Sequence, residues 1–242
     1  MDEDIEGTFS EELRRTGIAV DALPGVLAQF QRYRQALLDW NTRVNLTAIT
    51  SPEEVLSKHF LDSLSLLQAY DRPQTRLLDI GSGAGFPGLP LKIVRPQWRV
   101  VLVEATGKKV AFLQHMIEIL ELPGVTAIHA RAEELARQRE YRAAFDVVTA
   151  RAVAALPVLL EYAAPFCRAG GTIILLKKGD LAAELAQGKR AARQLGASLA
   201  ADQPVALAGL ADSRRLLVWQ QRSLCPQQYP RSHAAMVKNP LA

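Results

Sequence analysis

Apolar residues in the first part of the chain recur at helical spacing. Between positions 24 and 40 they are Val26, Leu27, Phe30, Tyr33, Leu37 and Trp40. This spacing predicts an amphipathic helix with Pro24 near its start. Ser51 and Pro52 are typical of an N-cap and a first helical residue, so a second helix is expected from there to about Tyr70. The first 70 residues or so are therefore predicted to be helical.

After Pro73 the pattern changes to short apolar runs that alternate with helical stretches. Such alternation is typical of a parallel sheet covered by helices on both faces. The expected strands are 76–80, 98–103, 124–129, 145–149 and 171–176, and the expected helices are 87–95, 107–121, 131–139 and 153–168.

The last part of the sheet should differ from the rest. An alanine-rich helix is expected over 182–201, and apolar runs follow at about 203–208 and 215–220. The loop between these two runs is too short for a helix, so they should pair antiparallel at the edge of the sheet. Beyond Ser223 the prolines predict an extended arm that lies over the domain.

We divide the chain into three parts on this basis. Residues 1–72 are expected to form a helical extension, in which the acidic residues 1–12 could be disordered. Residues 73–223 should form an α/β domain around a mostly parallel seven-stranded sheet with an antiparallel edge strand. Residues 224–242 should form a basic C-terminal arm.

Composition narrows the class of protein. Hydrophobic residues make up 49% of the 242 residues, yet no apolar run approaches the ~20 residues of a membrane span. The N-terminus is acidic, unlike a signal peptide, so we expect a cytoplasmic protein that does not bind membranes. We also expect a monomer. Cys167 and Cys225 cannot build a disulfide framework, and the four histidines lack the spacing of a zinc site, so no metal is expected.

Charge is distributed unevenly along the chain. The net charge is +4, and from Ser213 onwards there are five basic residues and no acidic ones. A basic C-terminal half suggests a polyanionic partner such as RNA, although a solvated basic surface would show the same pattern.

A glycine-rich turn after the first predicted strand is the strongest chemical signal. Gly81, Gly83 and Gly85 alternate and Gly88 follows, so the backbone can adopt positive φ and a ligand can approach it closely. Residues 83–88 match the dinucleotide pattern G-x-G-x-x-G, which is weak evidence by itself. A tight turn without a ligand is the structural alternative.

Two acidic residues at strand ends bear on which cofactor the turn could bind. Asp79, at the end of the first strand, would repel a pyrophosphate but could accept hydrogen bonds from an ammonium group. S-adenosylmethionine carries an ammonium group and no phosphate. Glu104, at the end of the second strand, could bind both ribose hydroxyls of an adenosine, which both kinds of cofactor contain. With Gly83 in the turn, both acids could bind S-adenosylmethionine. Glu104 would suit either cofactor, whereas Asp79 favours S-adenosylmethionine, and a dinucleotide remains the alternative.

Two later positions could belong to the same pocket. Glu133 follows the third strand, where a contact to the adenine edge is expected, although an acid at a helix N-terminus is also favoured by the helix dipole. Arg151 stands at the carboxyl end of the fourth strand, where open α/β sheets bind ligands, although it could also be a surface arginine.

Several motifs together resemble one known family, the small-subunit ribosomal RNA methyltransferase G family, also called glucose-inhibited division protein B. The motifs are N-L-T at 45–47, H-F-L-D-S-L at 59–64, L-D-I-G-S-G-A-G-F-P-G-L-P-L at 78–91, K-K-V-A-F-L at 108–113, R-A-E-E at 131–134, A-R-A-V-A at 150–154 and Y-P-R at 229–231. The glycine-loop motif with its F-P-G-L-P continuation is the most specific of them.

The resemblance implies a Rossmann-like class I S-adenosylmethionine-dependent methyltransferase fold. It further implies transfer of a methyl group from S-adenosyl-L-methionine to N7 of a guanine, position 527 in the 530 loop of bacterial 16S ribosomal RNA. The partner would be the small ribosomal subunit or its RNA. Carried onto this sequence, the family's cofactor contacts are Gly81, Phe86, Glu104, Ala105, Thr106, Ala132, Glu133 and Arg151.

The implied chemistry needs no general base, because guanine N7 has an in-plane lone pair and no proton. We therefore predict no catalytic residue. As RNA-binding residues we nominate Arg151, Lys177, Lys178, Tyr229 and Arg231. For Tyr229 the alternative is core packing, and for the two lysines it is a solvated strand end. His59 and Asp62 lie three positions apart on one helix face and are expected to form a structural hydrogen-bond network, with a substrate contact as the second interpretation.

Other functions remain open at this point. They are a nicotinamide-dependent oxidoreductase that uses Gly83, Gly85 and Gly88, a non-catalytic ribosome-binding factor, and a methyltransferase with a different RNA, protein or metabolite as its target.

Overall fold

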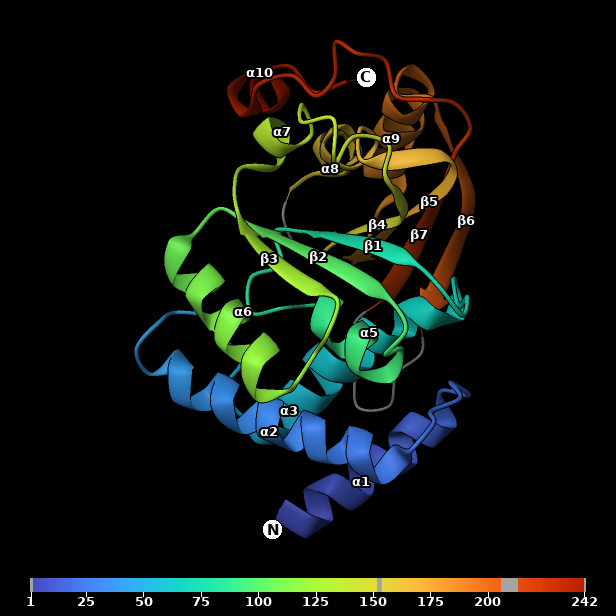
Figure 1. Cartoon of the computed structure of the whole chain (residues 1–242). Coiled ribbons are helices and arrows are strands. Elements are labelled where there is room, and N and C mark those ends of the chain that lie inside the picture. The colour runs from blue at the N-terminus through green and yellow to red at the C-terminus, as the bar shows by residue number, and fades with distance from the viewer. Residues whose placement is uncertain (1, 152–153, 206–212, 242) are drawn as a thin grey trace.

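A seven-stranded sheet runs through the middle of the molecule (Figure 1). The computed structural model describes residues 2–151, 154–205 and 213–241. Along the sheet the strand order is β3-β2-β1-β4-β5-β7-β6. The strands are β1 (Arg76–Ile80), β2 (Arg99–Glu104), β3 (Val125–His129), β4 (Phe145–Arg151), β5 (Cys167–Lys178), β6 (Ala197–Val205) and β7 (Arg214–Gln221).

Strands β1 to β5 pair in parallel, whereas β7 runs antiparallel to both β5 and β6. The two last strands therefore pair antiparallel at the edge, as the sequence predicts. The chain order reverses between β1 and β4, and open α/β sheets bind ligands outside the carboxyl ends of the strands at such a point.

The N-terminal helices cover one face of the sheet (Figure 1). They are α1 (Asp2–Arg15), α2 (Leu23–Asn41) and an irregular helical segment made of α3 (Pro52–Val55), the π-helix η1 (Leu56–Leu61), α4 (Asp62–Leu64) and the 3₁₀ turn η2 (Ser65–Gln68). Helices α5 (Gly88–Val94) and α6 (Gly107–Ile119) lie between them and the strands. None of the helices in the described ranges is long and apolar enough to cross a membrane.

The C-terminal helices cover the opposite face. They are α7 (Ala132–Leu135), α8 (Leu156–Ala163), α9 (Ala182–Gln194) and α10 (His233–Lys238). Successive strand residues point to opposite faces, so Leu77 joins the core under the N-terminal helices and Leu78 joins the core under α8 and α9. Because both faces are covered, β1 and β4 in the middle of the sheet are mostly buried on both sides, as parallel strands usually are.

Several element boundaries differ from the sequence prediction. The helix expected over 182–201 ends at Gln194, because Gly196 has a φ of +79° and stops it, and β6 then begins at Ala197. The helix expected over 153–168 ends at Ala163, shortly before Pro165, and that expected over 131–139 spans only Ala132–Leu135.

Both ends of the chain are more regular than the sequence suggests. The acidic N-terminal segment is part of helix α1. The arm contains the short helix α10, where the sequence suggests only an extended chain. Residues 206–208 of the strand expected at 203–208, and 153 at the start of one expected helix, lie outside the described residues. The proposed division into three parts stays a prediction.

An aromatic cluster joins the helical extension to the α/β domain. The ring of Phe60, in η1, is fully buried, and its centroid lies 4.8 Å from that of Phe30 and 5.1 Å from that of Tyr33. The same ring lies 6.1 Å from Phe9 of α1 and 6.0 Å from Phe86 in the glycine-rich turn. One side chain thus contacts two helices of the extension and the turn.

Replacing Phe60 by alanine should therefore destabilise the protein by about 3–5 kcal/mol, through lost burial and the cavity left behind. Urea unfolding followed by circular dichroism measures this change. Leu224→Ala is the control, since Leu224 is 64% exposed and its truncation should change the free energy of unfolding by less than about 0.5 kcal/mol. A loss below about 1 kcal/mol for Phe60→Ala would contradict this account.

Candidate functional site

The glycine-rich turn follows β1 at the point where the strand order reverses. Its glycines use backbone conformations that other residues avoid, with φ of +64° at Gly81, +60° at Gly83 and +97° at Gly85. At Gly85 an added Cβ would lie 2.6 Å from the Tyr33 hydroxyl and 2.4 Å from Leu89, so a side chain does not fit there. The N–H of Gly81 donates to the carbonyl of Val103 in β2 at 2.8 Å, which ties the turn to the neighbouring strand.

Glu104 connects this turn to the next one. Its Oε2 accepts a hydrogen bond from the N–H of Gly83 at 3.0 Å, and its Oε1 accepts one from the N–H of Thr106 at 2.9 Å. Thr106 is the N-cap residue of α6. A carboxylate has about four lone-pair sites, so two remain after these bonds, enough for the two ribose hydroxyls that the sequence assigns to it.

A pocket opens beside these turns, at the carboxyl ends of β1, β2 and β3. It brings together Gly81, Ala105, Ala132 and Glu133, which are far apart in sequence. The other residues that line it are Ile80, Val103, Ala130, Arg131 and Tyr162. Tyr162, on α8, has no sequence signal because it lies in no motif, and only the packing of α8 brings it to the pocket.

Asp79 lies under the turn and is completely buried. Its Oδ2 accepts a hydrogen bond from the N–H of Gly88 at 3.0 Å, while its Oδ1 has no partner among the described residues. Burial raises the pKa of this carboxyl to about 7, although the Gly88 N–H and the charge of Arg151 act against it. An unpartnered buried carboxylate oxygen suits a cationic donor, so the residues present fit an ammonium-bearing cofactor.

Phe86 lies on the other side of the turn, against the helical extension. Its ring stacks on His59 with centroids 4.4 Å apart and on Tyr33 with centroids 5.4 Å apart. The guanidinium of Arg151 lies over the same ring, 4.9 Å from its centroid. Phe86 is therefore packed among side chains of the extension and of β4.

Arg151 is bound mainly by the extension, although it ends β4. It donates to Oδ2 of Asp62 at 3.0 Å and to the Lys58 carbonyl at 3.1 Å, and lies 3.0 Å from Nδ1 of His59. Asp62 also pairs with Arg214 at the start of β7, at 2.6 Å. Burial, and secondarily the charge of Arg151, lowers the pKa of His59 to about 3, which keeps its ring neutral.

The network expected around His59 and Asp62 is thus present, and its hydrogen bonds also hold Arg151. The role predicted for Arg151 in cofactor and RNA binding stays a prediction. Of the other RNA-binding candidates, Lys177 pairs with Glu184 at 2.7 Å and its side chain is only 16% exposed, whereas Lys178 is exposed.

The two remaining RNA-binding candidates, Tyr229 and Arg231, are engaged in contacts within the protein. Tyr229 is 8% exposed and packs in the core under α8 and α9, so its ring offers no free face to a base. The guanidinium of Arg231 binds both carboxylate oxygens of Glu161, at 2.8 and 2.6 Å, and Glu161 is 1% exposed. Both residues anchor the arm in this structure, and RNA binding by them stays a prediction.

Within the described ranges we find neither a group of metal-binding side chains nor a reactive thiol. No three His, Cys, Asp or Glu side chains there are grouped as metal ligands. Cys167 and Cys225 are free thiols, and burial raises the pKa of each to about 12. Neither cysteine is therefore a ready nucleophile.

A family model described as rRNA small subunit methyltransferase G matches residues 26–205. The chain belongs to this family. A ribosomal RNA small subunit methyltransferase G from Roseiflexus sp. (strain RS-1) is 46% identical over 215 residues, covering 89% of this chain and 92% of that protein. One from Geobacillus kaustophilus (strain HTA426) is 42% identical over 234 residues, covering 96% of this chain and 98% of that protein.

Solved structures agree with the fold. TYW2 from M. jannaschii, crystallised in complex with AdoMet, is 16% identical with a TM-score of 0.53, and the match covers 67% of this chain and 76% of that one. TrmN from Thermus thermophilus is 20% identical with a TM-score of 0.52, covering 69% of this chain and 53% of that one. Family and fold together confirm the predicted S-adenosylmethionine-dependent rRNA methyltransferase and displace the oxidoreductase alternative.

The buried carboxyl of Asp79 makes stability depend on pH. In the unfolded chain an Asp ionises near pH 3.9, whereas in the folded protein the pKa is about 7. Between these values the folded state binds more protons, so the free energy of unfolding falls as the pH rises, by up to about 1.4 kcal/mol for each pH unit. Asp79→Asn cannot titrate and should lose less stability than the wild type across this window.

Urea unfolding of the cofactor-free wild type and Asp79→Asn, from about pH 4 to pH 8, measures the difference. The gap between the two free energies should change in favour of the variant as the pH rises to about 7, and stay constant above it. Parallel curves over the whole range would show that Asp79 titrates normally.

Proposed function

We propose that this chain transfers a methyl group from S-adenosyl-L-methionine to N7 of guanine 527, in the 530 loop of 16S ribosomal RNA. The observation that carries the proposal is the pocket at the carboxyl ends of β1, β2 and β3, in a chain of this rRNA methyltransferase family. The atom and the nucleotide follow from the resemblance set out above, and the chemistry of the site is compatible with them.

The residues around the pocket divide the work of holding the cofactor. Gly81, Ala105, Ala132 and Glu133 would enclose the adenosine, and Glu104 would accept hydrogen bonds from its ribose hydroxyls. The unpartnered Oδ1 of Asp79 would accept a hydrogen bond from the ammonium group. When bound, the cofactor supplies an electrophilic methyl group on a sulfonium.

For methyl transfer to N7, the main task of the protein is to position the guanine and the methyl donor. The attacking lone pair lies in the plane of the base and carries no proton, so alignment of the two reactants accounts for most of the acceleration. We therefore name no general base. The alternative of a cysteine attacking a pyrimidine ring is disfavoured by the buried thiols of Cys167 and Cys225.

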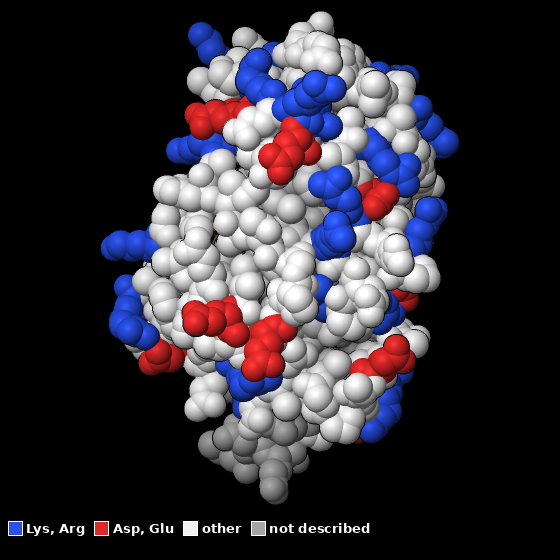
Figure 2. All heavy atoms as spheres, viewed as in Figure 1, with Lys and Arg blue, Asp and Glu red and all other residues white. Residues whose placement is uncertain are grey.

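RNA would approach the end of the sheet where β4 and β5 finish. Lys178 is exposed there, while Lys177 and Arg151 would exchange their present ion pairs with Glu184 and Asp62 for contacts with RNA phosphates. Figure 2 shows more basic than acidic side chains over the upper half of the molecule, the half that contains α7 to α10 in Figure 1. We further propose that the protein acts as a monomer in the cytoplasm, on the small ribosomal subunit or its RNA.

Chemical cleavage of ribosomal RNA tests the proposal. Borohydride and aniline break RNA at N7-methylguanine, and primer extension maps the break. RNA from cells that carry the gene should break at guanine 527, and this break should vanish on deletion and return when the gene is restored.

An unchanged pattern in the deletion strain, with binding of S-adenosylhomocysteine to the purified protein confirmed, would contradict the RNA target and retain the cofactor. A purified protein that binds the 30S subunit but methylates neither naked RNA nor any subunit state would instead indicate a non-catalytic ribosome-binding factor.

A further inference from the structure

The C-terminal arm, residues 224–241, returns to the cofactor pocket through α10. Tyr162 lines that pocket, and its hydroxyl shares a hydrogen bond with Nδ1 of His233, the first residue of α10, at 2.6 Å. The two rings are nearly parallel, with centroids 6.3 Å apart and an interplanar angle of 17°. A residue of the arm thus contacts a wall of the pocket directly.

The neighbouring residue of α8 gives the arm a second attachment. Glu161 accepts hydrogen bonds from the backbone N–H of Arg231 at 2.9 Å and from its guanidinium at 2.8 and 2.6 Å. Since this carboxylate is 1% exposed, the three bonds compensate a charge that would otherwise be buried without a partner. Arg231 and His233 therefore hold the arm to two consecutive residues of α8.

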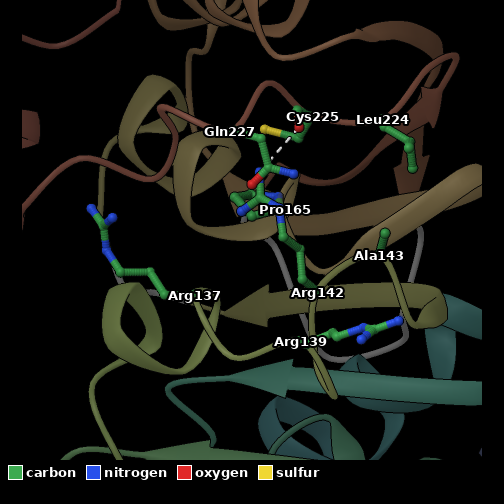
Figure 3. A pocket seen from close by; sticks show the side chains of 8 residues that line it. All are labelled: Arg137, Arg139, Arg142, Ala143, Pro165, Leu224, Cys225 and Gln227. Carbon is green, nitrogen blue, oxygen red and sulfur yellow. Dashed lines mark hydrogen bonds between the residues drawn. The ribbon is translucent and has the colours of Figure 1, made fainter.

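The segment that follows α7 holds the first part of the arm. Arg142 donates to the carbonyls of Cys225 at 3.0 Å, Pro226 at 3.0 Å and Tyr229 at 2.9 Å, and Arg137 donates to that of Pro230 at 2.8 Å. Figure 3 shows Arg142 reaching toward Cys225 beside Pro165. Helix α7, directly before this segment, begins with Ala132 and Glu133, two residues of the pocket. The arm is thus bound to α8 and to the segment that follows α7.

We propose that Tyr162 is a further cofactor-binding residue and that the arm positions it, through His233, as the outer wall of the adenosine pocket. This inference rests on the proposed function, because it assumes that the pocket holds the adenosine of S-adenosylmethionine. A tyrosine offers an apolar ring at a small entropic cost, and a fixed ring costs still less to order on binding.

We infer from the surroundings of Tyr162 that it acts through packing and hydrogen bonding. Burial, followed by the nearby charge of Glu133, raises the pKa of its phenol to about 12, so the group is neutral at physiological pH. Arg131 and Glu133, both of the pocket, are charged groups close enough to affect this phenol. Without His233, the phenol would lose the partner that fixes its ring at this wall.

If Tyr162 contacts both the arm and the cofactor, docking of the arm and binding of the cofactor are coupled, and such coupling is reciprocal. If the docked arm increases the affinity for the cofactor, the bound cofactor must stabilise the docked arm by the same factor. Loss of the contact should therefore weaken cofactor binding, and cofactor binding should slow amide hydrogen exchange in the arm.

Calorimetric titration with S-adenosylhomocysteine tests the first consequence. His233→Ala and Tyr162→Ala should each weaken binding by on the order of 10-fold, and Tyr162→Phe, which keeps the ring, by less than Tyr162→Ala. Val237→Ala is the matched control, because Val237 lies on the same short helix and is 55% exposed. This control should bind as tightly as the wild type.

Hydrogen exchange tests the second consequence, and its main measurement is made on the wild-type protein. Exchange in residues 229–238 should slow when S-adenosylhomocysteine is added, and His233→Ala should lose most of this slowing. Wild-type binding without any change of exchange in the arm, or equal affinity in His233→Ala, would overturn the inference. Failure of the wild type to bind S-adenosylhomocysteine at all would instead overturn the proposed function.

Discussion

The carboxylate of Glu104 joins the two loops on which the pocket depends. One oxygen binds the N–H of Gly83 in the glycine-rich turn, and the other binds that of Thr106 at the start of α6. Since Glu104 is only 7% exposed and ends a central strand, these bonds fix both loops relative to the sheet. The same carboxylate keeps two lone-pair sites beyond these bonds, which is why we propose that it also binds the ribose hydroxyls of the cofactor.

The helical extension supports this arrangement from the other side of the turn. Phe86 is enclosed by Tyr33 and His59 of the extension and by Arg151 of β4. Asp62 binds Arg151 and also Arg214, and so ties the ends of two strands to η1 and α4. Removing Asp62 would take a carboxylate partner from both arginines. The extension is therefore part of the site's framework, while the arm is bound to α8 and to the segment that follows α7.

Local sequence signals predict the strands, the turn and two residues of the pocket, Gly81 and Glu133, because their physical causes are local, whereas Ala105 and Ala132 are implied by the family resemblance. Glycines allow positive φ, and Glu104 and Glu133 follow strands whose carboxyl ends must meet at one edge of the sheet. Tyr162 could not be predicted in this way, because its position depends on how α8 packs. The same holds for Tyr229 and Arg231, where the sequence shows an aromatic and a basic residue but not the core and the Glu161 carboxylate that receive them.

Titration of S-adenosylhomocysteine into the wild type and into Glu104→Gln tests the account most directly. The variant keeps the shape of the side chain but turns one acceptor oxygen into a donor that faces a backbone N–H, so affinity should fall by more than about 10-fold. Glu134→Gln, at an exposed position of α7, should bind as the wild type does. Equal affinity in Glu104→Gln, or a wild type that binds NAD and not S-adenosylhomocysteine, would contradict the account.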